Sequence, residues 1–162
     1  MDLRTKMKLV LFLFALPSFS VIAQTGGKNE AIINRLKAEK CPECLLSADV
    51  PARIGEEVSV IGKVVDIVER TKGEDATMPI YFDIDKKFDD KNPTKRGNSF
   101  ALKLFPENRA KFLDYKKYKG KFVKITGKVI EEPVFADRPD ETNVKKASIT
   151  LTKPSQLQLL EP

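Results

Sequence analysis

The chain lacks two residue types that many enzymes depend on. Its 162 residues include no histidine and no tryptophan, and only two cysteines. Without histidine, a Ser-His-Asp or Cys-His nucleophile is excluded, and so are a histidine-ligated metal and an imidazole proton shuttle. Any catalysis would depend on carboxylates, Lys, Arg, Tyr or Cys. We therefore expect a protein that binds rather than catalyses, with no catalytic residues, no metal and no cofactor.

Long hydrophobic runs are also absent, apart from one at the N-terminus. Arg4, Lys6 and Lys8 precede this apolar stretch, and residues 21–23 supply the small side chains of a cleavage point. The pattern predicts a secretory signal peptide over residues 1–23, and an uncleaved N-terminal anchor is the alternative. We expect a secreted or periplasmic protein that has no membrane span after cleavage.

The remaining length fits one small domain with a short leader. We expect a leader with a short helix and both cysteines over residues 24–46, and a β domain over residues 47–162. The whole chain has a net charge of +6. The signal peptide accounts for part of this charge, so the mature protein is mildly basic. That balance is compatible with a polyanionic partner, but many secreted proteins share it.

One segment occurs twice, at an offset of 65 residues. Gly55 to Asp66 reads GEEVSVIGKVVD, and Gly120 to Glu131 reads GKFVKITGKVIE. Each copy predicts a strand that bends at its inner glycine, because glycine inside a strand marks a bulge, a corner or a close backbone approach. Two bent strands in one small domain predict a sheet that curls and closes into a barrel.

The other predicted elements extend this pattern. They are a helix over 30–40, strands over 56–69, 78–85 and 99–105, a helix over 106–118, strands over 121–132 and 147–151, and a pairing extension over 156–160. A helix between the third and fourth strands is the arrangement of the OB-fold, a five-stranded Greek-key barrel. The predicted fold class is therefore mainly β, and a β-sandwich with one helix is the alternative.

Three segments resemble a known family. They are SADVPARIGEEVSVIGKV at 47–64, YKGKFVKITGKV at 118–129 and ITLTKPSQL at 149–157. These segments resemble bacterial secreted OB-fold domains related to nucleic-acid-binding OB modules. The resemblance covers Ala48 to Leu160 and implies the fold, and it supplies no catalytic motif. The insert around 133–146 departs from the family, where a ligand loop would lie.

Cys41-Pro42-Glu43-Cys44 is the sharpest short motif. In a secreted chain with two cysteines, an intramolecular disulfide between Cys41 and Cys44 is the plain interpretation. A zinc half-site completed by dimerisation and a redox-active pair are the alternatives. The zinc alternative lacks a second ligand pair, and the redox alternative lacks the βαβ unit that such motifs occupy.

Two charged clusters have less specific interpretations. Asp83, Asp85, Asp89 and Asp90 could attract a hard cation, and Asp83 and Asp85 are expected to share one strand face. A solvated face and loop is the more ordinary interpretation. Several lysines between positions 116 and 124 are expected to form a solvated helix end.

A third group marks the candidate binding face. In OB-folds, strands two and three form the ligand face together with the first and last loops. The candidate residues there are Arg70, Lys72, Tyr81, Lys86, Lys87, Phe88, Lys95, Arg96, Lys103, Lys145 and Lys146. Tyr81 and Phe88 would stack on bases, and the cations would contact phosphates. The aspartates of the same region would oppose phosphate binding.

The sequence thus favours an exported OB-fold protein that binds single-stranded nucleic acid or another polyanion. A module that contacts protein, peptide or glycan in the cell envelope is the alternative, because OB-folds also bind oligosaccharides. An OB-fold nuclease is disfavoured, because the paired acid and arginine residues of such enzymes are not found on the matching strands.

Overall fold

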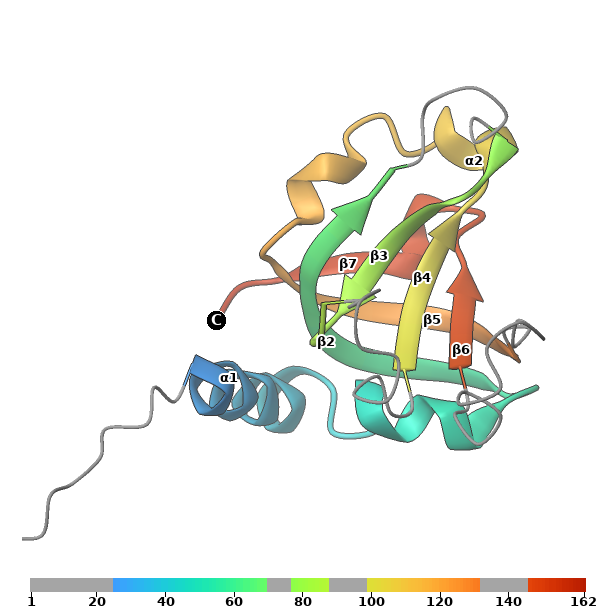
Figure 1. The fold of residues 1–162 in the computed structure, drawn as a ribbon. Coiled ribbons are helices and arrows are strands. Elements are labelled where there is room, and N and C mark those ends of the chain that lie inside the picture. The colour runs from blue at the N-terminus through green and yellow to red at the C-terminus, as the bar shows by residue number, and fades with distance from the viewer. Residues whose placement is uncertain (1–24, 70–76, 88–98, 132–145) are drawn as a thin grey trace, which may run out of the picture.

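The computed structural model describes residues 25–69, 77–87, 99–131 and 146–162 (Figure 1). The helical elements are α1 (Thr25–Lys40), η1 (Ser47–Arg53), α2 (Pro106–Arg109), η4 (Tyr115–Tyr118) and η6 (Pro154–Gln156). The strands are β1 (Leu45–Leu46), β2 (Glu57–Val68), β3 (Ile80–Ile84), β4 (Ser99–Leu104), β5 (Phe122–Glu131), β6 (Lys146–Thr150) and β7 (Leu157–Leu160). Among these residues, no helix is both long and apolar enough to cross a membrane.

Five of the strands close into a barrel. They follow the order β2-β3-β4-β6-β5, and β5 returns to pair with β2. Neighbours are antiparallel except β4 and β6, which run parallel. Counted along the barrel strands alone, this order is 1-2-3-5-4-1, and α2 lies between the third and fourth of them. The predicted OB-fold arrangement is therefore confirmed, and the β-sandwich alternative is wrong.

The two copies of the repeat pair with each other at the seam of this barrel. Val58 lies opposite Gly127, and Gly62 lies opposite Val123. Beyond its glycine, each strand leaves this pairing and joins a new partner. β2 continues against β3 with Val64 opposite Ile84, and β5 continues against β6 with Val129 opposite Ile149. The repeat therefore encodes the two bends that let a sheet close.

The barrel interior is filled with apolar side chains. Val60, Phe82, Leu102 and Ile149 are fully buried, and they belong to one continuous cluster contributed by all five barrel strands. Burial of each such side chain stabilises the fold by about 1.5–3 kcal/mol. Val50 of η1 joins the same cluster, and in Figure 1 η1 lies at one end of the barrel and α2 at the other.

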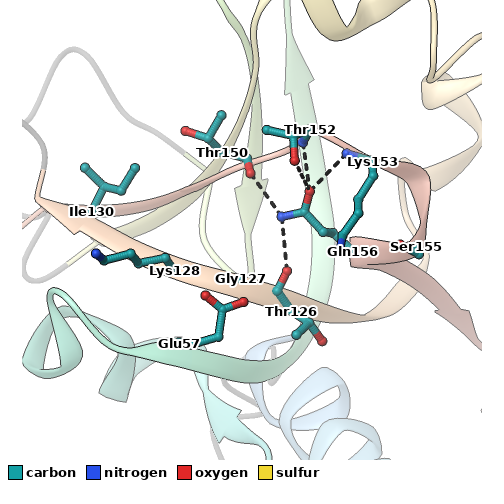
Figure 2. A pocket seen from close by; sticks show the side chains of 10 residues that line it. All are labelled: Glu57, Thr126, Gly127, Lys128, Ile130, Thr150, Thr152, Lys153, Ser155 and Gln156. Carbon is teal, nitrogen blue, oxygen red and sulfur yellow. Dashed lines mark hydrogen bonds between the residues drawn. The ribbon is translucent and has the colours of Figure 1, made fainter.

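β6 and β7 behave as one interrupted strand along β5. β6 pairs with the second half of β5 and β7 with the first, and the chain leaves the sheet between them. The Gln156 side chain bridges the interruption. Its amide nitrogen donates to the Thr126 and Thr150 carbonyls at 3.2 and 3.1 Å, and its oxygen accepts from the Thr152 and Lys153 backbone N–H groups (Figure 2). Gln156 thus supplies hydrogen bonds where the strand ladder is broken.

The N-terminal helix packs on the outside of the barrel. Ile33 and Leu36 of α1 form a second apolar cluster with Ile61 of β2 and Phe122 of β5. The cluster also contains Cys41 and Cys44, which form a disulfide as predicted and are fully buried. The Lys37 ammonium donates to the carbonyls of Pro42 and Cys44, which fixes the turn after the helix. The domain boundary between residues 46 and 47 stays a prediction.

Two helical predictions differ from the structure. α1 begins at Thr25, five residues before the predicted start, and so includes two glycines that were expected in a leader. The helix predicted over 106–118 is two short pieces, α2 and η4, separated by a turn. Phe112, Tyr115 and Tyr118 pack against the core at intervals of three residues, while Leu113 is 90% exposed. A spacing of three favours 3₁₀ turns over a continuous α-helix.

Candidate ligand-binding face

One row of side chains crosses the outer wall of the barrel. Cross-strand pairing places Val68 of β2 beside Tyr81 of β3, Tyr81 beside Lys103 of β4, and Lys103 beside Thr150 of β6. We call these four residues the Tyr81 row. Val68 is exposed and the other three are half-buried. The row lies outside the barrel because its members alternate with Phe82, Leu102 and Ile149, which fill the interior.

An aromatic ring and an ammonium group meet at the centre of this row. The Lys103 Nζ lies 5.7 Å from the centroid of the Tyr81 ring, within cation–π range. Both residues were predicted as part of the ligand face, and the structure brings them together on the second and third barrel strands. A flat ring beside a cation can accept a base by stacking and a phosphate by charge attraction.

The next row toward η1 contains two buried polar residues. Asp83 is 6% exposed and Ser148 is 1% exposed, although both point outward from the sheet by alternation. Asp83 was expected on a solvated face, so that prediction is wrong. Because Asp83 is buried and has partners of its own, its carboxylate is not presented beside the Tyr81 row. Of the aspartates expected to oppose phosphate binding, Asp83 is thus withdrawn from the surface.

Asp85 does not share a strand face with Asp83. β3 ends at Ile84, and Asp85 has a φ of +61°, in the left-handed region that aspartate tolerates better than most residues. Its carboxylate accepts from the Lys63 backbone N–H at 2.6 Å and from the Ser47 hydroxyl at 2.5 Å. Burial raises the pKa of this carboxyl, and the two hydrogen bonds oppose that effect. The Asp85 carboxylate therefore links β2, the end of β3 and η1.

Lys87, after β3, lies next to Asp66, two positions from Val68 on β2. Lys86 and Lys87 are exposed, and Lys87 forms an ion pair of 2.9 Å with Asp66 of β2. Asp66 also pairs with Lys119 at 2.6 Å. Hydrogen bonds from Lys119 and Lys87 hold the pKa of the Asp66 carboxyl well below its usual range. Lys87 is thus already neutralised, although an exposed pair of this kind is weak enough to exchange partners.

The remaining predicted residues divide into two groups. Lys146 is described, half-buried on β6 opposite Ser99, two rows from Tyr81. Arg70, Lys72, Phe88, Lys95, Arg96 and Lys145, together with Asp89 and Asp90 of the acidic cluster, lie outside the described residues. Their part in the face stays a prediction. The described part of the predicted face is therefore centred on Tyr81 and Lys103.

The cysteine motif offers ligand atoms but not in a metal-binding form. Sγ of Cys41, Sγ of Cys44 and a carboxylate oxygen of Glu43 lie within 4.8 Å of one another. Zinc binds thiolates, and two sulfurs joined in a disulfide provide none. Glu43 instead lies 3.5 Å from the Lys124 ammonium. The disulfide of this motif therefore cross-links the turn between α1 and β1.

Sequence reasoning missed several residues near the face. Val68 and Thr150 belong to the Tyr81 row, and Lys128 and Lys153 lie beyond Thr150 on a cleft described below. Strand alternation could have found Thr150 and Lys128, since both alternate with core residues of predicted strands. Lys153 could not have been found, because it follows the interruption between β6 and β7.

Comparisons with known proteins leave the family open. No protein-family model and no curated protein matches the chain. Among solved structures, it is similar to an aspartyl-tRNA synthetase from Entamoeba histolytica, with a TM-score of 0.44 and 12% identity over 74% of this chain and 22% of that one. It is also similar to a putative aspartyl-tRNA synthetase from Leishmania major Friedlin, with a TM-score of 0.42 and 10% identity over 82% of this chain and 26% of that one. The chain thus spans about a quarter of the length of these enzymes, and its assignment as an OB-fold rests on its own strand order and closure.

Proposed function

We propose that the chain is an exported OB-fold protein that binds single-stranded nucleic acid on the outer face of β3 and β4. The observation that carries the proposal is the pairing of the Tyr81 ring with the Lys103 ammonium at the centre of that face. Stacking of a base on an aromatic ring is worth about 1–3 kcal/mol and tolerates any base. Lysine contributes a charge to the phosphate backbone without reading sequence.

In the described part of the chain, side chains occupy the barrel interior, which therefore does not compete with this face. Buried side chains of all five strands fill this interior, so we place the ligand on the outer wall. Asp83 and Ser148 of the neighbouring row are buried, so over β3, β4 and β6 the Tyr81 row offers the more accessible side chains. A strip one row wide that crosses several strands suits an extended chain better than a compact small molecule.

The test is the affinity for a fluorescent oligothymidine of about 10 nucleotides, measured by anisotropy between 50 and 200 mM NaCl. We expect binding that weakens with salt. Tyr81→Ala should weaken it by about 5- to 150-fold, whereas Tyr81→Phe should keep the wild-type affinity. Lys103→Ala should lower the salt slope by about 0.7, the value for one phosphate contact of a single strand.

Lys40→Ala provides the matched control, because Lys40 is exposed at the end of α1 and contributes the same charge outside the Tyr81 row. Circular dichroism would verify that each variant is folded. If the wild type shows no binding at 50 mM NaCl, or if Lys40→Ala weakens binding as much as Lys103→Ala, the proposal is wrong. Binding of a peptide or glycan in place of the oligonucleotide would then favour an envelope interaction module.

A further inference from the structure

A cleft of about 470 Å³ opens on the barrel wall where β6 and β7 are interrupted (Figure 2). Its walls are the outer face of β5 from Thr126 to Ile130 and the connection from Thr150 to Gln156, with Glu57 at the rim. The hollow lies where the chain leaves the sheet between β6 and β7. The Tyr81 row, which carries the proposed function, ends at Thr150 on this same cleft.

The cleft is preorganised by Gln156. All the hydrogen-bonding capacity of its side chain is used, since the nitrogen donates to two carbonyls and the oxygen accepts from two backbone N–H groups and the Thr152 hydroxyl. Gln156 therefore builds the base of the cleft and contributes no bond to a ligand. Because the floor of the cleft is fixed by these hydrogen bonds, the side chains around it need little rearrangement to bind a ligand.

Two ammonium groups supply the charge of the cleft. Lys128 and Lys153 are exposed, and no carboxylate of the described residues forms an ion pair with either. Glu57 is the one acidic residue of the lining, so the cleft has a net charge of +1. The hydroxyls of Thr126 and Ser155 lie in the same lining. Ammonium and hydroxyl groups with no aromatic ring suit a phosphate rather than a base.

The cleft and the Tyr81 ring are separated by three strand spacings. The strands from Tyr81 to Lys128 follow one another as β3, β4, β6 and β5, so the path along the wall measures roughly 15 Å. OB-folds occupy about 4–16 nucleotides of a single strand, which is ample to cover this distance. We infer that the cleft is a subsite in which Lys128 and Lys153 bind a phosphate. The phosphate would belong to the same nucleic-acid strand that stacks a base on Tyr81. This inference rests on the proposed function.

The test compares two double variants that remove the same charge. Lys128→Ala/Lys153→Ala should weaken oligothymidine binding about tenfold at 50 mM NaCl and lower the salt slope by about 1.4, two contacts of about 0.7 each. Lys28→Ala/Lys40→Ala on α1 should leave both quantities near the wild type. In spectra of ¹⁵N-labelled wild-type protein, the amides of Gly127, Lys128 and Ser155 should shift on titration together with those of Tyr81 and Lys103.

The outcomes separate this inference from the proposed function. If Tyr81→Ala weakens binding and Lys128→Ala/Lys153→Ala does not, the subsite is refuted and the binding face stands. If the two double variants weaken binding equally, the loss is an effect of net charge and the subsite is refuted. The subsite is also refuted if the amides of the cleft do not shift. If no oligonucleotide binds the wild type, both proposals fail together.

Discussion

Val60 of β2 lies directly opposite Ile125 of β5, the residue that holds the same place in the second copy of the repeat. A local two-fold axis therefore passes between them and relates Gly62 to Gly127. A Cβ atom on Gly62 would lie 2.5 Å from Ile84 Cγ2, and one on Gly127 would lie 2.6 Å from Ile149 Cγ2. The two isoleucines are related by the same offset as the glycines. At each bend, the isoleucine side chain thus occupies the space that a Cβ atom on the glycine would need.

The first prediction concerns this fit. Gly127→Ala should lower the free energy of unfolding by about 1–3 kcal/mol, because the added methyl group overpacks against Ile149. The measurement is urea unfolding followed by far-UV circular dichroism, since the chain has no tryptophan to report by fluorescence. Gly27→Ala is the control. Nothing lies within 4 Å of its added Cβ in α1, and alanine there should stabilise the helix by up to about 1 kcal/mol. Equal stability of Gly127→Ala and the wild type would contradict the fit.

The second prediction concerns the bridge between β6 and β7. Gln156→Ala should destabilise the protein by about 2–4 kcal/mol, since it removes several hydrogen bonds and leaves the Thr126 and Thr150 carbonyls without this donor. Gln158→Ala, two residues further on an exposed position of β7, should change the stability by less than about 0.5 kcal/mol. Similar losses in the two variants would show that Gln156 has no special part in the barrel wall.

The third prediction concerns the pH dependence of stability. Burial places the pKa of Asp85 in the folded protein above its value in the unfolded chain. The contribution of Asp85 to folding stability is therefore most favourable below its pKa in the unfolded chain, near 3.9. This contribution is lost as the pH rises through its pKa in the folded protein. Asp85→Asn keeps a residue that tolerates the left-handed backbone and removes the buried charge. Relative to the wild type, this variant should become more stable from pH 3 to pH 7.

Asp66→Asn should give the opposite trend in the same titration. The folded pKa of Asp66 is lowered, so its contribution is present above the unfolded pKa and is lost as the pH falls. We expect a loss below about 1 kcal/mol at pH 7, because Lys87 and Lys119 are largely exposed and water screens the pairs. Parallel pH profiles for the two variants would contradict both assignments.

The fourth prediction concerns export. When the full chain is produced in a bacterium with a periplasm, the mature protein should begin at Gln24 and be recovered outside the cytoplasm. Its intact mass should match residues 24–162 with Cys41 and Cys44 oxidised, and it should show no free thiol until it is reduced. An intact N-terminus in the membrane fraction would instead identify residues 1–23 as an anchor.

The sequence allowed prediction of the barrel because two signals agreed. Alternating and β-branched segments located the strands to within about two residues, and the repeated glycines located the bends. It did not reveal η1, whose Val50 is fixed by contacts with the barrel interior rather than by local pattern. Nor did it reveal the start of α1, because the glycines at 26 and 27 are poor helix formers and packing further along the helix outweighs them.

The candidate face was predicted in part for a similar reason. Strand order placed Tyr81 and Lys103 on it, and their pairing across β3 and β4 follows from register. Alternation also assigned Asp83 to solvent, yet its burial depends on tertiary packing that no local pattern encodes. Lys153 belongs to a cleft created by a break in a strand, so only coordinates could place it beside Lys128.

The filled interior of the barrel has a kinetic consequence. Val60, Phe82 and Ile149 fill the barrel, so the binding proposed above does not require the interior to open. In that proposal the partner meets β3 and β4, which are already paired in the sheet. We therefore expect association near the 10⁵–10⁷ M⁻¹s⁻¹ typical of macromolecular docking, accelerated at low ionic strength, with differences in affinity expressed mainly in how long the complex lasts.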